Sequence, residues 1–221
     1  MGKIYEALER AEETGSVKRG ARHEPFDGSV FDQQPELVVL GRPGASIAEK
    51  FRFLRSLIVR PPDGTVRRTL LITSALQGEG KSFVASNLAV TIAQGLDEHV
   101  LLVDADLRNP RLHSIFGYPA EIPGLADHLL DGVELPEVLK RPVALEGGYG
   151  EKFSVLPAGK PTPNPHELLS SQRMRRFIAE VRDRYPDRYI IFDRAQSADT
   201  EGGHQGGPGA HTKRAFSGGG L

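Results

Sequence analysis

The sequence of 221 residues has no cysteine, no excess of either charge and no long apolar run. Without cysteine the chain can form neither disulfides nor thiolate metal sites. Its 28 basic residues are matched by 29 acidic residues, so charge gives no reason to expect nucleic acid or an anionic membrane surface as the main partner. The apolar runs are too short to cross a bilayer, and the N-terminus carries no apolar signal-peptide core. We therefore expect a cytoplasmic chain without a transmembrane segment.

The most informative stretch of the chain is residues 70–89, LLITSALQGEGKSFVASNLA. An apolar strand, a glycine-bearing turn and a helix that begins at Lys81 follow one another, which is the layout of a phosphate-binding loop. Gly78 and Gly80 let backbone N–H groups approach a polyphosphate, and the helix adds the positive end of its dipole. The strict pattern has glycine where this chain has Ala75, which is small enough for the tight turn. We therefore predict a nucleotide site rather than a merely flexible loop.

Three carboxylates are expected to gather near that loop. The apolar run 100–103 predicts a strand buried on both faces that leads into Asp104 and Asp106, and the strand predicted at 189–192 leads into Asp193. Because the carboxyl ends of parallel strands lie at one edge of an α/β sheet, these side chains should lie beside the phosphate loop. Mg²⁺ and a reacting hydroxyl would offset the cost of burying them. The alternative is a hydrogen-bonded turn in which an aspartate caps the next short helix.

Strands and helices alternate along the chain, which predicts the α/β class with a parallel sheet. We expect an N-terminal amphipathic helix and linker at 1–35, a nucleotide-binding domain at 36–193 and a disordered, glycine-rich tail at 194–221. Residues 36–40 are expected to form a short strand or an extended approach to the domain. The expected strands are 67–73, 100–103, 153–156 and 189–192, and the expected helices are 46–59, 81–94, 125–130, 135–139 and 166–184.

The helix predicted at 46–59 carries three charged residues in one strip. Glu49, Arg52 and Arg55 follow one another at steps of three, which places them along neighbouring positions of the helix surface. Spacing alone favours a solvated face with a helix cap, and an interface is the alternative.

Several further segments, in order along the chain, carry a resemblance to one family. They are MGKIYEALERAE at the start, EKFRFLR as an E-x-x-R-x-x-R helix, the phosphate loop as a Walker A motif, LLVDADLRNPRLHSIFG as a Walker A-prime motif, GLADHLLDG, LPAGKPTPNPHELLSSQRM, and YIIFD as a Walker B strand. Over residues 2–193 the chain resembles the bacterial tyrosine kinases of polysaccharide synthesis, which are P-loop autokinases. Its first residues resemble the exosortase-associated branch of that family.

The resemblance implies a P-loop NTPase-type sheet, mostly parallel and flanked by helices, that transfers a phosphoryl group from ATP, with Mg²⁺, to a tyrosine hydroxyl. A phenol with a pKa of about 10 must lose its proton as it attacks, and Asp104 or Asp106 is the candidate acceptor. The implied roles are nucleotide binding for Gln77, Gly78, Glu79, Gly80, Lys81, Ser82 and Phe83; catalysis for Lys81, Asp104 and Asp106; metal binding for Ser82, Asp104 and Asp193; and a subunit interface for Glu49, Arg52 and Arg55.

The same resemblance implies partners and a process, which is exopolysaccharide biosynthesis or export. The partners are further copies of the chain in a ring, a membrane polysaccharide copolymerase that activates the kinase at the inner face of the plasma membrane, and protein tyrosine substrates, with no nucleic acid. Two alternatives stay open. One is a partitioning or septum-site ATPase switch, although Leu76 stands where those ATPases have a signature lysine. The other is an inactive ring subunit or scaffold for the copolymerase.

The chain departs from the family after Asp193. Family members continue with two prolines and further strands, whereas eight of the last twenty residues of this chain are glycine. The family's C-terminal tyrosine cluster is also missing, since the tyrosines are Tyr5, Tyr118, Tyr149, Tyr185 and Tyr189. We therefore expect a sheet that is incomplete on its C-terminal side, weak stability and poor or absent kinase activity. We hypothesise that the reading frame is disrupted just after Asp193, which translation of the other two frames would test.

Overall fold

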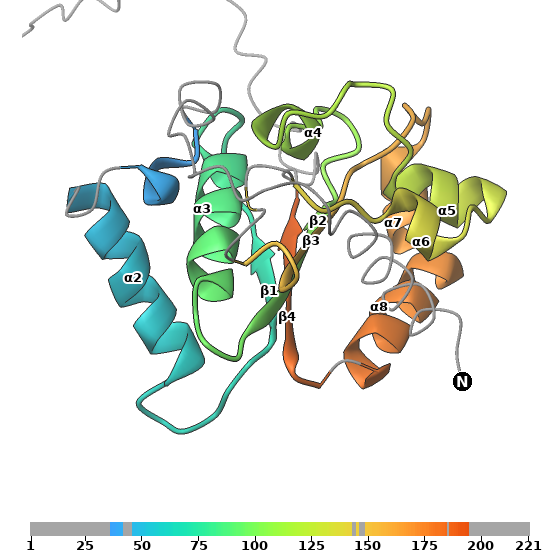
Figure 1. Ribbon diagram of the computed structural model, residues 1–221. Coiled ribbons are helices and arrows are strands. Elements are labelled where there is room, and N and C mark those ends of the chain that lie inside the picture. The colour runs from blue at the N-terminus through green and yellow to red at the C-terminus, as the bar shows by residue number, and fades with distance from the viewer. Residues whose placement is uncertain (1–35, 42–45, 143–144, 146–148, 185, 195–221) are drawn as a thin grey trace, which may run out of the picture.

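The computed structural model describes residues 36–41, 46–142, 145, 149–184 and 186–194 (Figure 1). The expected N-terminal helix and linker, and the tail from residue 195 onward, lie outside these residues. Among the helices that are described, none has the length and apolar character needed to cross a bilayer. The elements, in chain order, are the 3₁₀ helix η2 (Val38–Leu40), α2 (Ser46–Val59), β1 (Thr69–Ile72), α3 (Lys81–Ala93), β2 (His99–Asp104), α4 (Leu112–Ile115), α5 (Leu125–Asp131), α6 (Leu135–Val138), β3 (Phe153–Leu156), α7 (Pro165–Ser170), α8 (Gln172–Arg184) and β4 (Arg188–Asp193).

The four strands form one parallel sheet in the order β1-β4-β2-β3. The central strands β2 and β4 carry apolar runs that are buried on both faces, as is usual for parallel sheets. In the register of the sheet, Asp193 of β4 stands opposite Asp104 of β2 and Ile72 of β1. The predicted α/β class with a parallel sheet is therefore confirmed, and the carboxyl ends of the strands share one edge.

Helices cover both faces of the sheet, which gives three layers (Figure 1). Because side chains alternate between the faces along a strand, each strand divides its apolar residues between two cores. On the face covered by α2, α3, α4 and η2, the strand residues in the core are Val100, Leu102, Phe153, Val155, Tyr189 and Ile191. On the face covered by α5, α6, α7 and α8, they are Leu101, Val103, Leu156, Ile190 and Phe192.

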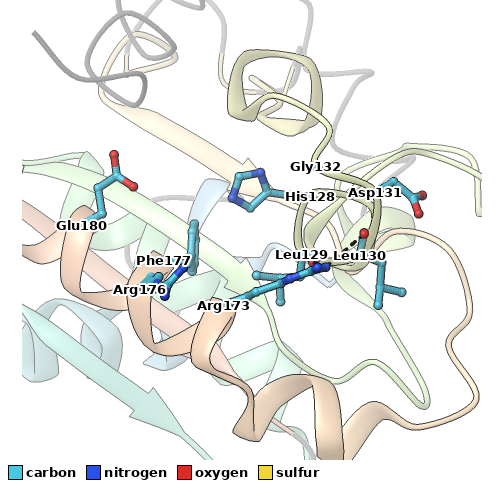
Figure 2. Close-up of a pocket in the computed structure, with 9 residues that line it drawn as sticks. All are labelled: His128, Leu129, Leu130, Asp131, Gly132, Arg173, Arg176, Phe177 and Glu180. Atoms are coloured by element: carbon cyan, nitrogen blue, oxygen red, sulfur yellow. Dashed lines mark hydrogen bonds between the residues drawn. The ribbon is translucent and has the colours of Figure 1, made fainter.

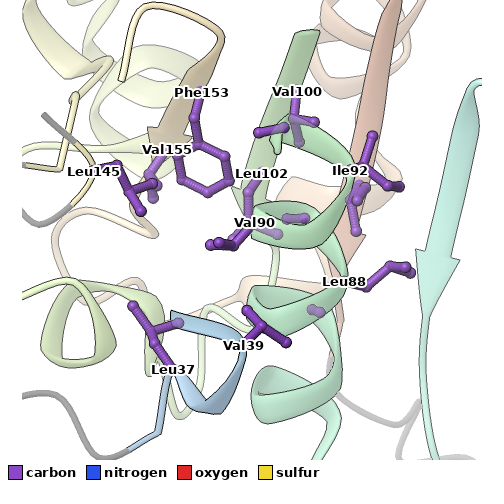
Figure 3. Packing of buried hydrophobic residues seen from close by; sticks show 14 of the residues in the cluster. Leu37, Val39, Leu88, Val90, Ile92, Val100, Leu102, Leu145, Phe153 and Val155 are labelled. Carbon is purple, nitrogen blue, oxygen red and sulfur yellow. The ribbon is translucent and has the colours of Figure 1, made fainter. Parts of the chain in front are cut away.

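Helix α3 lies at the centre of one of these cores (Figure 3). It is buried continuously from Ala85 to Ala93, which fits a helix that is covered on all sides. Figure 3 shows Val90 beside Leu102 of β2, and Val39 of η2 beside an earlier turn of the same helix. This packing fixes the first turn of α3, and with it the phosphate loop, relative to the ends of the central strands.

Strand β1 lies at an edge of the described sheet and is less covered than the central strands. Leu70 and Ile72 face the α3 core and are partly buried, whereas Leu71 on the opposite face is 54% exposed. An exposed leucine on an edge strand leaves both apolar surface and backbone groups without a neighbour from the described sheet. The expected incompleteness of the sheet on its C-terminal side stays a prediction.

Two predicted elements differ from the structure. The helix expected at 166–184 is two helices, because the backbone of Ser171 is extended (ψ 161°) between α7 and α8. The Ser171 hydroxyl accepts the Met174 N–H over 3.2 Å and so caps the start of α8. The segment 36–40, expected to be a strand or an extended approach, is instead a turn followed by η2.

Candidate functional site

The phosphate loop connects β1 to α3 at the carboxyl edge of the sheet. Gly78 and Gly80 adopt φ angles of 83° and 88°, in the left-handed region that glycine enters without strain. The loop is braced from within, because the Leu76 N–H donates to the Glu79 carboxylate over 2.9 Å. Helix α3 then begins at Lys81. The strand, turn and helix of a phosphate-binding loop therefore follow one another as the sequence predicts.

A cavity of about 280 Å³ opens at the start of α3. Most of the predicted nucleotide-binding residues line it, together with one predicted catalytic aspartate: Gln77, Gly78, Gly80, Lys81, Ser82, Phe83 and Asp106. The ring of Phe83 packs edge-on against Phe51 of α2, with the ring centres 6.0 Å apart. Glu79, Asp104 and Asp193 are not in the wall. The structure thus gathers residues from the loop and from the end of β2 around one space.

Lys81 and Asp106 face each other in this cavity. Lys81 Nζ lies 4.0 Å from Asp106 Oδ2, and both side chains are more than nine-tenths buried. The Asn109 N–H donates to Asp106 Oδ1 over 3.0 Å and so fixes the carboxylate from the other side. The pair joins the phosphate loop to the turn after β2, and its ammonium group is placed where phosphate oxygens would lie.

Asp104 is fully buried at the end of β2 and is bound by the backbone. Its Oδ1 accepts the Asp106 N–H (3.2 Å), and its Oδ2 accepts the N–H groups of Arg111 (3.1 Å) and Leu112 (3.0 Å). Because α4 begins at Leu112, Asp104 caps this short helix. Burial raises the pKa of Asp104 to about 8; the Leu112 N–H opposes the rise and the Asp193 carboxylate adds to it.

Asp193 ends β4 directly beside Asp104 and is equally buried. Neither of its carboxylate oxygens has a hydrogen-bond partner among the described residues. Burial raises the pKa of Asp193; the nearby Ser82 hydroxyl opposes the rise, Asp106 adds to it and the Lys81 ammonium opposes it. A buried carboxylate without a partner is costly, so a cation between Ser82 and Asp193 would stabilise the site.

Mg²⁺ fits this corner of the site. The described part of the chain contains no group of three or more His, Cys, Asp or Glu side chains that could hold a metal by itself. Mg²⁺ does not need such a group, because it commonly takes one or two protein oxygens together with phosphate oxygens and waters. Ser82 and Asp193 offer oxygens of this kind, whereas the oxygens of Asp104 already accept backbone N–H groups.

The sequence prediction missed four residues of the cavity wall, which are Glu36, Asn109, Arg111 and Ile115. Three of them follow β2 within LLVDADLRNPRLHSIFG, so the motif itself carried a signal for them. A turn that leaves a strand at the carboxyl edge of a sheet is a place where ligand contacts are expected. Glu36 had no local signal of this kind, because it reaches the cavity through a contact with a distant part of the chain.

That contact is made by Asn87, a buried polar residue of α3. Its amide group donates to the carbonyls of Glu36 (2.7 Å) and Phe83 (2.9 Å) and accepts the Val39 N–H (3.2 Å). The side chain therefore satisfies backbone groups that strand pairing would otherwise satisfy. The bonds to Glu36 and Val39 hold this segment against α3.

The three residues predicted to form a subunit interface all lie on α2, but they do not form one cluster. Glu49 and Arg52 pair with each other on the exposed surface. Arg55 turns toward the domain and pairs with Glu98, at 3.2 Å, beside the start of β2. Phe53 on the same helix is 66% exposed. Glu49 and Arg52 are therefore accessible, whereas Arg55 has a partner within the chain, and the interface stays a prediction.

A second cavity, of about 380 Å³, lies between α5 and α8 on the opposite face of the sheet (Figure 2). Arg173 of α8 donates to the carbonyls of Leu129 (2.6 Å) and Leu130 (3.1 Å) at the end of α5, where a cation is favourable. His128 packs against Phe177, with the ring centres 5.8 Å apart. None of the predicted site residues lines this cavity, so the smaller cavity at the phosphate loop is the candidate site.

Known proteins resemble this chain in sequence and structure, although no family model matches it. The tyrosine-protein kinase YwqD of Bacillus subtilis is 34% identical over 160 residues, which cover 72% of this chain and 63% of YwqD. The succinoglycan biosynthesis transport protein ExoP of Rhizobium meliloti is 32% identical over 187 residues, which cover 83% of this chain and 22% of ExoP. The solved kinase domain of the Escherichia coli tyrosine kinase ETK matches with a TM-score of 0.62 and 32% identity, over 81% of this chain and 64% of that domain.

The chain therefore spans less than two thirds of the length of each of these proteins. The similarity nevertheless extends over most of the described residues and agrees with what the structure places together. A phosphate loop, a lysine at the start of α3 and Asp106 line one cavity, and the two neighbouring strands β2 and β4 end in aspartates at the same edge of the sheet. On this sequence and fold similarity, the chain belongs to the bacterial tyrosine kinase family.

Proposed function

We propose that this site binds ATP with Mg²⁺ and transfers the terminal phosphoryl group to a tyrosine hydroxyl, including tyrosines of the kinase itself, at the low rate expected of an incomplete sheet. The observation that carries the proposal is the buried carboxylate of Asp193, which accepts no backbone N–H in the described structure and lies near the Ser82 hydroxyl. A carboxylate and a hydroxyl beside a phosphate loop suit a nucleotide with its Mg²⁺ ion. The kinase names of the relatives support the reaction class.

The phosphate loop and Lys81 bind and orient the polyphosphate. The left-handed glycines Gly78 and Gly80 keep side chains away from the path of the phosphates, and the start of α3 presents unpaired N–H groups to them. Lys81 can turn from Asp106, 4.0 Å away, toward the β- and γ-phosphate oxygens. When Mg²⁺ is bound, it neutralises charge that develops on the transferred group.

Asp106 is the stronger candidate for the group that accepts the tyrosine proton. It lies in the cavity wall, whereas Asp104 does not. The carboxylate of Asp104 accepts three backbone N–H groups, including that of Asp106 itself. A general base must come within hydrogen-bonding distance of the proton that it accepts. We therefore assign proton acceptance to Asp106, and to Asp104 the role of holding the turn that carries it.

We further propose that the chain acts in exopolysaccharide biosynthesis or export. The name of ExoP, a succinoglycan biosynthesis transport protein, supports this process. The partner would be a membrane polysaccharide copolymerase at the inner face of the plasma membrane. The exposed Glu49–Arg52 pair and the exposed ring of Phe53 make α2 a suitable surface for assembly into a ring, because charged pairs around an apolar contact are typical of interfaces.

Calorimetric titration with ATP and Mg²⁺ tests the site. We expect the unaltered chain to bind and Lys81→Ala to lose about 100-fold in affinity, because the ammonium contact with the phosphates is removed. Lys160→Ala is a matched control, since Lys160 pairs with Asp131 and is not part of the cavity wall. An unaltered chain that binds no nucleotide contradicts the proposal, and so do equal affinities for the two variants.

Phosphoryl transfer is tested separately, by detecting phosphotyrosine after incubation with ATP and Mg²⁺. Asp106→Asn keeps the shape of the side chain but cannot accept the proton, so we expect the rate to fall by about 10²-fold or more. Its affinity for ATP should stay close to that of the unaltered chain. A normal rate for Asp106→Asn would remove the assigned role.

A further inference from the structure

An ion pair lies at the edge of the phosphate cavity. Arg111 Nη2 lies 3.1 Å from Glu36 Oε1, and both residues are part of the cavity wall. Their side chains are 58% and 40% exposed, and pairs that are this exposed contribute little to stability. A pair that lines the site but adds little to the fold is a candidate for ligand recognition.

Both residues reach the cavity from fixed parts of the backbone. The Arg111 N–H donates to the buried carboxylate of Asp104 over 3.1 Å. The carbonyl of Glu36 accepts a 2.7 Å bond from the Asn87 side chain, and the next residue, Leu37, is buried. The two side chains therefore meet at a defined place even though 75 positions separate them in the sequence.

The cavity wall holds two cations, and each of them faces a carboxylate. Lys81 lies 4.0 Å from Asp106, and Arg111 lies 3.1 Å from Glu36. A polyphosphate entering this space competes with each carboxylate for its cation. The planar guanidinium of arginine binds carboxylate and phosphate with the same two-pronged geometry, so Arg111 can exchange one for the other with little movement.

We propose that Arg111 contacts the terminal phosphate of ATP, and that Glu36 is the positioning residue that holds the guanidinium at the cavity edge until the phosphate replaces its carboxylate. This inference rests on the proposed function. The terminal phosphate is favoured over the inner ones because Arg111 belongs to the turn that carries Asp106, where the phosphoryl group is transferred. The inner phosphates would lie on the N–H groups around Gly80 and Lys81.

The test compares the affinities for ATP and for ADP, each with Mg²⁺, by calorimetry. Arg111→Ala should weaken ATP binding by about tenfold and ADP binding by less than about twofold, because only ATP carries the phosphate that Arg111 contacts. Arg111→Lys keeps the charge but loses the two-pronged contact. Its affinity for ATP should therefore lie between that of the unaltered chain and that of Arg111→Ala. Arg67→Ala is the matched control, since Arg67 makes a similarly exposed pair with Asp63 outside the cavity.

Glu36→Gln tests the positioning role. It should tighten ATP binding by about threefold in the unaltered chain, because the competing carboxylate is removed, and should have no such effect when Arg111 is already alanine. Thermal melting of each variant checks that it folds. If Arg111→Ala does not fold, the ratio of the ATP affinity to the ADP affinity of Arg111→Lys tests the inference in its place.

Three outcomes overturn the inference: no change on replacing Arg111, equal losses for ATP and ADP, or an effect of Glu36→Gln that persists without Arg111. If the unaltered chain binds neither nucleotide, the proposed function falls and this inference falls with it. If the unaltered chain binds ATP and Lys81→Ala does not, but the Arg111 variants fail to separate ATP from ADP, only the role of Arg111 is lost.

Discussion

Asp104 and Asp193 end neighbouring strands in register, and both carboxylates are fully buried. Their hydrogen bonds differ completely. Asp104 accepts three backbone N–H groups from the turn that follows β2. Asp193 accepts no backbone N–H from any residue that the structure describes, and the Ser82 hydroxyl lies near it. Two acids of the same type, depth and position in their strands are thus satisfied in opposite ways.

The difference separates a residue of the fold from a residue of the ligand site. A buried carboxylate with three N–H donors stabilises the turn that supplies them. A buried carboxylate without donors destabilises the protein unless a ligand satisfies it. Asp104 therefore organises the turn that carries Asp106 and Arg111, whereas Asp193 is available to a cation near Ser82.

Replacing Asp104 should give the largest effect. Asp104→Ala leaves three N–H groups without their acceptor, so the free energy of unfolding should fall by about 3 kcal/mol. Urea denaturation measures this change. Asp104→Asn retains one amide oxygen and should lose less. If Asp104→Ala unfolds at the same urea midpoint as the unaltered chain, the turn does not depend on this carboxylate.

Replacing Asp193 should have the opposite effect on stability and a separate effect on binding. Asp193→Asn removes a buried charge that has no backbone N–H donor in the described structure, so without metal the free energy of unfolding should rise by about 1 kcal/mol. Calorimetry with Mg²⁺ should show about tenfold weaker ATP binding, because a metal ligand is lost, and the two affinities should converge in EDTA. If Asp193→Asn is less stable than the unaltered chain and binds ATP normally, Asp193 has a structural role and is not a metal ligand.

The sequence predicted the phosphate loop because its signal is local. Gly78, Gly80 and Lys81 stand at fixed spacing between a strand and a helix, and the structure has that order. The α/β class followed in the same way from the alternation of apolar runs. The break at Ser171 was missed, although the apolar spacing changes there: Leu168 lies six positions before Met174, which would place the two on different faces of one continuous helix. The Ser171 hydroxyl, which caps α8 through the Met174 N–H, marks the break in the structure.

The sequence could not separate Asp104 from Asp193, since each follows an apolar strand. Their difference depends on which backbone N–H groups reach each carboxylate, and for Asp104 the turn before Leu112 supplies them. The interpretation that an aspartate caps the next short helix was available and describes Asp104. The position of Glu36 at the cavity could not be predicted from the sequence, because it depends on the bond to Asn87, 51 positions away.

The last expected effect is on the pH dependence of stability. Burial raises the pKa of both carboxylates, that of Asp104 from 3.8 to about 8. The folded protein then keeps protons that the unfolded chain releases between about pH 4 and pH 8, so the free energy of unfolding falls as pH rises through this window.

In metal-free buffer we expect lower stability at pH 8 than at pH 5 from this pair. Asp193→Asn should flatten this dependence, because it removes one raised group and also the charge that adds to the rise at Asp104. Urea midpoints of both proteins at the two pH values measure the difference. If the two proteins lose the same stability between pH 5 and pH 8, Asp193 neither takes up a proton in this window nor raises the pKa of Asp104, which contradicts the proposed buried charge at Asp193.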